Sequence, residues 1–413
     1  MEVSTRLKQA KQWLLSGDFL YNHTLAILLW FGLPVISIIH TLVKDNHINN
    51  FIIFRSVFYH AVSNLNLYHA YPQEYADVNL YGPVFSVVIA PFALLPVQLG
   101  FVLWSLFNVW ILYFAIRKLP IQKQWQNAVL IFSCNEMLNN TAWSQINPFI
   151  LALLMLGFVY AEKGKNEWAL LFILLATFIK LYGIVGFAFF LFNDKKRSFI
   201  VWALVWSVVF FLLPMLIAGP YFAAHSYVDW YNAITEKAVK NIRMDIHNDL
   251  QDISVMGMIK RIFNLPNFKT IWVLLCAGVM FAFQFMHVAY YKDIRFKLYI
   301  LCSVCIAVVI FNTSSESPTY IIAFPMVCVW YLMQPPTKTN NALFIFAIIL
   351  TCFSYSDIFT PYVRTHIVRP YSLKALPCFV IWIVLSVQLY TKQFLKVDLA
   401  RQRKNKPVLN AAI

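Results

Sequence analysis

Charged residues are scarce in this 413-residue sequence. Lys, Arg, Asp and Glu together make up 12% of it, and hydrophobic residues make up 60%. In a soluble domain about a quarter of all residues are charged, so this composition excludes a soluble globular protein. Acidic residues are scarcer than basic ones. The chain has 18 Asp and Glu against 33 Lys and Arg, which gives a net charge of +15. Because many of the bases lie in short segments between apolar runs, we attribute the excess to membrane topology and contact with anionic membrane lipids, and expect no nucleic-acid partner.

Nucleotide-binding motifs are also absent. The sequence has no GxGxxG, no P-loop and no large soluble domain, so a nucleotide or nucleotide-sugar site has no familiar place. The seven cysteines are odd in number and all lie within apolar runs. Cys302 and Cys305 form a CxxC inside one such run, where packing is the expected role. We therefore expect no cofactor and no metal.

The sequence contains repeated apolar runs of about 20 residues. Each run is long enough to cross roughly 30 Å of hydrocarbon as a helix. We predict an all-α polytopic membrane protein, a monomer, with one transmembrane domain over residues 1–413. The twelve predicted crossings are 22–43, 80–97, 99–116, 126–142, 145–161, 167–193, 199–218, 270–291, 297–312, 318–333, 341–356 and 373–391.

Twelve crossings put both termini on one side of the membrane. The basic head, residues 6–11, and the basic tail, residues 392–413, place that side in the cytoplasm. Residues 49–62 and 226–264 are predicted to form interfacial helices in the outer loops. The long connections that then face outward are 44–79, 219–269 and 357–372.

A second topology stays open. In it, residues 80–116 cross only once, and residues 167–193 form a re-entrant hairpin that breaks at Lys180. This alternative moves the basic segments 117–123 and 162–165 to the cytoplasm, where the charge bias favours them.

Polar side chains within the apolar runs are candidates for function, because they are costly inside a bilayer. Lys180 stands far from either end of its run, which favours a buried functional lysine over one that reaches the interface. Gln145 and Asn147 belong to an amide-rich stretch that forms either interhelical hydrogen bonds or the wall of a polar cavity.

Two outward segments carry further candidates. Glu316 and Tyr320 lie in TSSESPTYIIAF, which forms either a site or a plain polar turn with Ser317 as the helix cap. The segment before the last crossing is unusually basic for the outer side, so its cations either hold a phosphate or fix the span at the interface. The candidate phosphate ligands are Arg364, Arg369 and Lys374, with Arg55 and His60 of the first outer loop.

Four segments together resemble glycosyltransferase family 87, which are integral membrane enzymes of the GT-C superfamily. They are NNFIIFRSVFYHAVSNLNLYHAYP, LYGPVFSVVIAPFALLP, SQINPFILALLMLGF and FIKLYGIVGFAFFLFNDKKR. The resemblance covers the chain from about residue 48 to the last span, and FR-x-x-x-x-H, SESPTY and RPY-x-LKALP mark a closer subgroup.

The resemblance implies a GT-C bundle and a polyprenyl-phosphate sugar donor. The sugar, a mannose or another hexose or pentose, would pass to a lipid or glycan acceptor on the outer face of the cytoplasmic membrane. It also implies inversion at the anomeric carbon, without a nucleotide or a metal.

The chemistry that the resemblance implies requires a carboxylate base in the first outer loop and cations that hold the departing phosphate. Relatives such as the mannosyltransferases of phosphatidylinositol mannoside synthesis carry an aspartate where this sequence has Asn50. An amide cannot accept the proton, so another carboxylate is expected to act. Asp77 is the first candidate and Glu74 the second, because residues three apart on a helix line one face. Asp45, Glu316 and the acids of residues 226–264 follow.

Two other interpretations stay open. A transporter or flippase would also place lysine and amide side chains at mid-membrane. A catalytically inactive relative of the same fold is the other, and Asn50 is the residue that suggests it.

Overall fold

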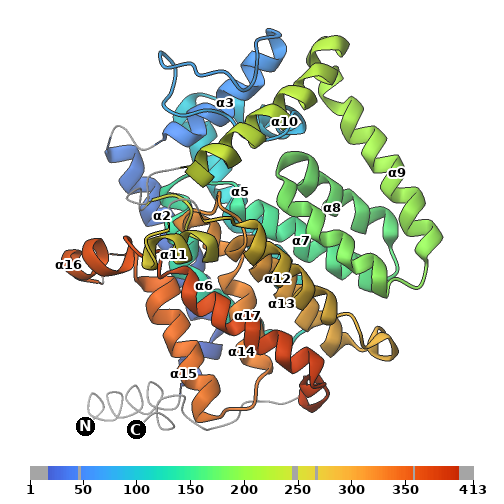
Figure 1. Ribbon diagram of the computed structural model, residues 1–413. Helices are drawn as coiled ribbons and strands as arrows, with labels where there is room; N and C mark the ends of the chain where they lie inside the picture. The colour runs from blue at the N-terminus through green and yellow to red at the C-terminus, as the bar shows by residue number, and fades with distance from the viewer. Residues whose placement is uncertain (1–16, 45–47, 244–249, 266–267, 357–358, 400–413) are drawn as a thin grey trace. The chain divides into compact units, whose positions relative to one another are not determined.

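The computed structural model describes residues 17–44, 48–243, 250–265, 268–356 and 359–399. Within these ranges every regular element is a helix (Figure 1). Asp45, the predicted basic head and the tail beyond residue 399 lie outside the described residues.

The chain divides into two compact units. Unit 1 comprises residues 1–33, 119–136 and 246–413, and unit 2 comprises residues 34–118 and 137–245. Helices α2 (His23–Val43) and α6 (Lys123–Ala142) continue from one unit into the other. The other helices of unit 2 are α3 (Asn49–Val62), α4 (Val84–Ala93), α5 (Val97–Lys118), α7 (Asn147–Glu162), α8 (Asn166–Ile179), α9 (Lys196–Leu212), α10 (Pro220–Arg243) and two 3-10 helices, Leu181–Phe192 and Leu213–Leu216.

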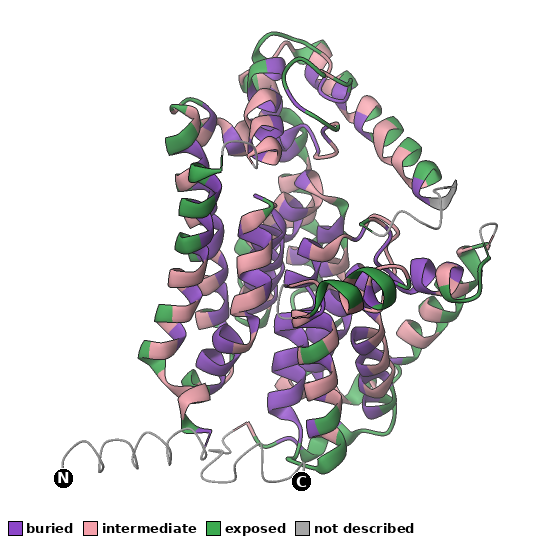
Figure 2. Ribbon diagram, turned by 90° about the vertical axis from the view of Figure 1, so that its left-hand side faces the viewer, coloured by how far each residue is buried: buried purple, intermediate pink, exposed green. Residues whose placement is uncertain are grey.

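Unit 1 is built from shorter helices joined by tight turns. Its α-helices are α11 (Val255–Ile262), α12 (Ile271–Phe283), α13 (Ile294–Ile310), α14 (Phe324–Met333), α15 (Lys338–Ala347), α16 (Pro361–Val363) and α17 (Ala375–Tyr390). Between them lie the 3-10 helices Asp18–Tyr21, Val288–Tyr290, Ser317–Ile321 and Gln393–Lys396 and the π-helices Ile348–Phe353 and Arg364–Val368. All ten residues of α14 are buried, whereas α12 has no buried residue although it is apolar throughout. Exposed apolar positions of this kind are typical of a surface that faces lipid, and Figure 2 shows exposed residues recurring along several helices.

Helices occupy all twelve predicted spans, but few are long enough to cross a membrane alone. By length and composition, three of the described helical segments qualify: His23–Val43, Val97–Lys118 and Lys196–Leu216. Helix α4 has ten residues, which is about 15 Å, half the hydrocarbon thickness. A Cβ added to Gly100 of α5 would lie 2.4 Å from the Phe92 carbonyl, so α4 turns back tightly onto α5. The structure therefore supports a helical membrane protein without establishing twelve crossings.

The prediction of one continuous crossing over 167–193 is wrong. Helix α8 ends at Ile179, and Lys180 has an extended backbone with φ −145° and ψ 123°. A 3-10 helix of 12 residues follows, Leu181–Phe192. The break falls at the residue where the second topology places it.

Helix α8 and the 3-10 helix Leu181–Phe192 pack against each other as a helical hairpin. A Cβ added to Gly183 would lie 2.2 Å from the backbone nitrogen of Thr177, so only glycine allows this approach. At the open end, Asn166 and Asn193 exchange two side-chain hydrogen bonds, of 3.3 and 2.6 Å. Lys180 consequently lies at the tip of the hairpin, and the second topology is favoured for this segment.

Candidate functional site

Asn49, the first residue of α3, fixes the loop that carries Asp77. Its Nδ2 donates to the carbonyl of Ala76 at 2.8 Å, and its Oδ1 accepts from the N–H of Ala76 at 2.9 Å. Ala76 precedes Asp77 in the chain, and Asn49 precedes Asn50. This pair of hydrogen bonds brings the predicted base to the helix end where the resemblance implies an aspartate.

Asp77 has an unusual backbone conformation. Its φ of 79° lies in the left-handed region, which aspartate enters more readily than most residues. Its Oδ1 accepts a hydrogen bond from the N–H of Val78 at 2.9 Å, and the side chain is exposed. A loop that holds a strained residue with an exposed carboxylate is a reason to test that residue for function.

The turn between α6 and α7 contacts three parts of unit 2. Asn50 donates through Nδ2 to the carbonyl of Trp143 at 2.7 Å. Gln145 accepts a hydrogen bond from the hydroxyl of Tyr81 at 3.2 Å. Asn147, which is buried, accepts one from Nζ of Lys180 at 2.8 Å. The predicted polar residues of this turn therefore bond to α3, to the loop after Asp77 and to the hairpin tip.

The ammonium of Lys180 lies against two tyrosine rings. Its Nζ lies 4.3 Å from the ring centroid of Tyr182 and 5.9 Å from that of Tyr81, an arrangement that stabilises a cation. Gly82, next to Tyr81, donates its N–H to the carbonyl of Ile179 at 2.9 Å. Tyr81 and Tyr182 were not predicted. Both lie in the tripeptide Leu-Tyr-Gly, which occurs at residues 80–82 and 181–183. This repeat is the sequence pattern that could have indicated the two tyrosines.

Glu74 and His60 pair with each other near the opposite end of α3. Nε2 of His60 lies 3.2 Å and 3.1 Å from the two carboxylate oxygens of Glu74, and the centroid of the imidazole lies 4.1 Å from that of the Tyr71 ring, with the two planes tilted by 39°. His60 is buried while Glu74 is 44% exposed. Burial first, and then the Glu74 charge, raises the pKa of Tyr75 above its ordinary value.

The prediction that Glu74 and Asp77 share one helix face is wrong. Residues 71–82 form turns and irregular loop, not a helix. The pairing with His60 also gives Glu74 a structural role that Asp77 does not have. Asp77 is the better of the two candidates for the base.

The guanidinium of Arg55 bonds to neighbouring residues of α3 and α4. Its Nε donates to the carbonyl of Ala93, near the end of α4, at 3.1 Å, and its Nη2 lies 3.2 Å from the hydroxyl of Tyr59. The guanidinium carbon lies 4.7 Å from the Tyr59 ring centroid. These contacts cap α4 and tie it to α3.

In unit 1, the TSSESPTY turn is joined to the loop before α11. The carbonyl of Ser315 accepts a hydrogen bond from the N–H of Ile253 at 2.8 Å. The hydroxyl of Tyr320 donates one to the carbonyl of Ile253 at 2.9 Å. Glu316, rather than Ser317, is the N-cap residue of the short helix, and its N–H donates to Thr319 at 3.1 Å. This capping role accounts for Glu316 without any catalysis.

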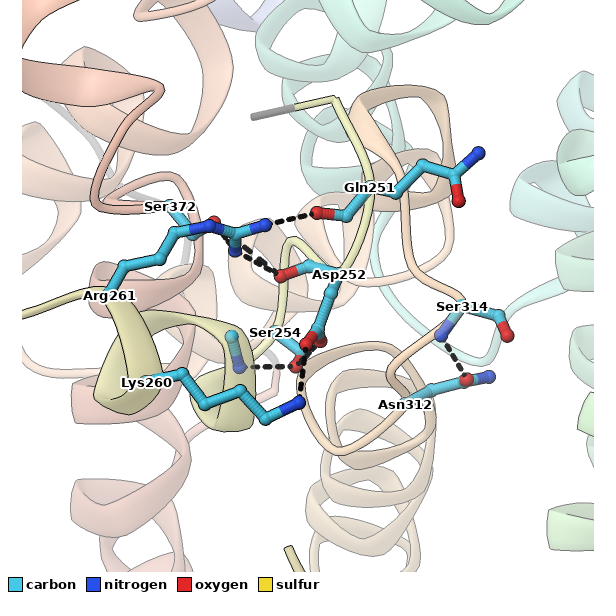
Figure 3. Close-up of polar contacts among 9 residues, drawn as sticks. Gln251, Asp252, Ser254, Lys260, Arg261, Asn312, Ser314 and Ser372 are labelled. Atoms are coloured by element: carbon cyan, nitrogen blue, oxygen red, sulfur yellow. Dashed lines mark hydrogen bonds and ion pairs between the residues drawn. The ribbon is translucent and has the colours of Figure 1, made fainter. Parts of the chain in front are cut away.

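The same loop is held from its other side (Figure 3). Arg261 of α11 donates to the carbonyls of Gln251 and Asp252, both at 2.8 Å, and to the hydroxyl of Ser372 at 2.5 Å. Lys260 lies 3.4 Å from the Asp252 carboxylate, which also accepts from Ser254 at 2.6 Å. Burial raises the pKa of the Asp252 carboxyl, although Ser254 and the nearby cations oppose the shift. The loop thus joins two segments of the predicted subgroup pattern.

Lys374 is paired inside unit 1. Its Nζ lies 2.7 Å from Oε1 of Glu136, and both side chains are almost fully buried. The ammonium also lies 5.3 Å from the ring centroid of Tyr320 and 5.5 Å from that of Tyr355. Sequence reasoning did not find this pair, because 238 positions separate the partners.

A sequence model of glycosyltransferase family 87 matches residues 79–312. The match covers more than half of the chain. The chain belongs to glycosyltransferase family 87. No curated protein and no solved structure matches it.

Family 87 membership implies a glycosyltransferase, and the apolar helices indicate a membrane protein. The matched region contains Lys180, Gln145, Asn147 and their tyrosine partners. It begins two residues after Asp77 and ends before Glu316 and the cations at 364–374. The family therefore supports the general activity, but the matched region includes neither Asp77 nor the cations at 364–374.

Proposed function

We propose that this protein transfers a sugar from a polyprenyl-phosphate donor to a lipid or glycan acceptor, with Asp77 as the general base. The observation that carries the proposal is the pair of hydrogen bonds between Asn49 and Ala76. These bonds join the residue before Asp77 to the residue before Asn50, the position where relatives carry an aspartate. Asn50 thus marks a relocated base rather than an inactive site.

The reaction is a displacement at the anomeric carbon. The acceptor hydroxyl oxygen forms the new bond to this carbon, and the bond from the carbon to the phosphate oxygen breaks with inversion. The hydroxyl proton passes to the carboxylate of Asp77, and the electron pair leaves with the polyprenyl phosphate. General base catalysis of this kind contributes about 10²–10⁴-fold in rate.

The departing phosphate gains negative charge, and Lys180 is the cation of unit 2 that we assign to it. An ammonium held by an amide oxygen and two ring faces is positioned in advance, so little reorganisation is needed when charge develops. Gln145 and Tyr81 fix the turn beside it. These contacts come from segments within or directly before the region that matches the family.

The resemblance and the composition support the setting of the reaction. We place the protein in the cytoplasmic membrane as a monomer, with the site open to the outer face, and with a mannose or another hexose or pentose as the transferred sugar. The predicted outward placement of the first loop, which carries Asp77, and the lack of a nucleotide-binding motif support the outer face.

A transfer assay with the purified full-length protein tests the proposal. It offers a panel of synthetic polyprenyl-phosphate sugars with membrane lipid extract as acceptor. Sugar transfer from at least one donor is the expected result. Absence of transfer from every donor, together with movement of the lipid-linked sugar across liposomes, would instead identify a transporter.

A further inference from the structure

A tryptophan with an exposed indole directly follows α6. Trp143 is 54% exposed, and among the residues that the structure describes its indole has no ring contact and no hydrogen-bond partner. Trp110 and Trp168 of unit 2 are exposed to a similar extent, but each lies against an aromatic ring. The ring centroids are 5.7 Å apart between Trp110 and Phe114 and 6.2 Å apart between Trp168 and Tyr160. The indole of Trp143 therefore does not belong to the aromatic packing of unit 2.

The chain reverses direction immediately after Trp143. Ser144 has a φ of 52°, in the left-handed region. Its N–H donates to the carbonyl of Thr141 at 3.0 Å, and the N–H of Gln145 donates to the carbonyl of Asn140 at 3.2 Å, which is the Schellman pattern of a helix C-terminus. Glycine usually occupies the first of these two positions, and an apolar residue the second. A turn that departs from the stable pattern at both positions is a candidate for function.

Two amide side chains at this turn are only partly used by the protein. Asn50 donates through Nδ2 to the carbonyl of Trp143 at 2.7 Å, and Oε1 of Gln145 accepts from the hydroxyl of Tyr81 at 3.2 Å. Oδ1 of Asn50 and Nε2 of Gln145 have no partner in the described part of the chain, and both residues are half-exposed. One hydrogen-bond acceptor and one donor therefore remain on residues that are bonded or close in sequence to Trp143.

We propose that Trp143 binds a pyranose ring on its exposed face, and that the remaining amide groups of Asn50 and Gln145 bond to hydroxyls of the same sugar. One face of a pyranose carries C–H groups, which stack on the negative face of an aromatic ring, and its edge carries hydroxyls that both donate and accept. Asn50 then has a role that needs no carboxylate: it fixes the tryptophan, while Asp77 supplies the base. The assignment of this sugar to the donor or the acceptor rests on the proposed function, whereas the binding of a pyranose does not.

An exposed tryptophan can instead anchor a protein at the membrane–water interface. Such an anchor needs exposure but no adjacent amide groups, so Trp168, which is 48% exposed, would qualify as well. Trp168→Leu is therefore the matched control for Trp143→Leu. If both tryptophans are anchors, the two variants should bind a sugar equally.

The test measures saturation-transfer NMR from full-length protein in nanodiscs to methyl α-mannopyranoside and methyl β-glucopyranoside, with glycerol as a polyol that lacks a ring. We expect the ring C–H protons of at least one glycoside to receive saturation, and those of glycerol to receive none. Trp143→Leu should reduce the signal at least about fivefold, and Trp143→Phe should reduce it less. Asn50→Ala and Gln145→Ala should each reduce it about threefold, while Trp168→Leu should match the unchanged protein.

Kinetics in the transfer assay distinguish the two sources of the sugar. A rise of about tenfold in KM for the donor alone in Trp143→Leu would assign the pyranose to the donor. The same rise for the acceptor alone would assign it to a sugar-bearing acceptor, and either result supports the inference. Unchanged KM values for both substrates would overturn it.

The binding measurement separates this inference from the proposed function. Absence of saturation in the unchanged protein, or equal saturation in the unchanged protein and Trp143→Leu, would overturn the inference and leave the proposed function standing. Saturation that depends on Trp143, without transfer from any donor, would support pyranose binding and contradict the proposed function. Because the indole is exposed, its replacement leaves the core intact, and the unfolding midpoint of each variant checks this.

Discussion

Asn49 and Ala76 exchange two hydrogen bonds, and these bonds hold the loop of Asp77 against the first turn of α3. The position of Asp77 therefore depends on a residue with no chemical role of its own.

Asn49→Ala should lower kcat about tenfold and change KM little, because one net hydrogen bond contributes about 1 kcal/mol and a misplaced base slows the chemical step. The measurement is initial rate against donor concentration. Asn64→Ala is the matched control, since Asn64 follows the other end of α3 and accepts one hydrogen bond, from Gly219. An equal loss of kcat in both variants would mean that Asn49 acts through general stability.

Lys374→Met should destabilise the protein by about 3–5 kcal/mol, because it leaves the Glu136 carboxylate buried without its cation. Glu136→Leu added to it should recover most of that loss. Equilibrium unfolding in detergent micelles gives the coupling energy from a double-mutant cycle. Additive effects of the two substitutions would show that the ion pair contributes nothing specific.

The hairpin predicts that residues 164 and 195 lie on the same side of the membrane. Nζ of Lys195 would lie 3.8 Å from a Cβ placed on Gly164, which brings the two basic segments together. In a cysteine-free background, Gly164→Cys and Lys195→Cys should both react with a membrane-impermeant maleimide only after the cytoplasmic side is opened. If the two cysteines were labelled from opposite sides of the membrane, residues 167–193 would instead form one continuous crossing.

Asp252 predicts a pH dependence of stability. Its pKa is raised in the folded state, so the folded protein binds this proton more tightly than the unfolded chain, in which an aspartate titrates at about pH 3.9. This contribution is fully present below that pH and declines as the pH rises through the folded pKa. The stability of the unchanged protein relative to Asp252→Asn should therefore fall as the pH rises above about 4. A difference that stays constant or grows with pH would contradict the assignment.

Much of the secondary structure was predictable from sequence. Residues 49–62 were predicted as a helix, and α3 spans Asn49–Val62. The ends of α2, α5 and α7 lie within a few residues of their predicted spans, because long apolar runs bounded by polar residues leave little choice. The break at Lys180 was available as an alternative because it moves the basic segments 117–123 and 162–165 to the cytoplasm.

The pairings within the site were not predictable. Nothing in the local pattern distinguishes a Glu74 that pairs with His60 from one that faces a substrate, because both would be acidic residues in a polar loop. The link from Glu136 to Lys374 depends on the packing of α6 against the start of α17, which no local periodicity encodes. Asn49 was overlooked for a related reason: its function lies in side-chain bonds to a backbone 27 residues away.

The rate of Asp77→Asn tests the central claim most directly. It is measured with the polyprenyl-phosphate sugar that the unchanged protein uses, on a variant whose unfolding midpoint is also recorded. Asp194→Asn, an exposed aspartate in the link before α9, is the matched control. The account predicts a fall in kcat of about 10²–10⁴-fold in Asp77→Asn, with near-normal rate in the control. Full activity in Asp77→Asn would contradict it.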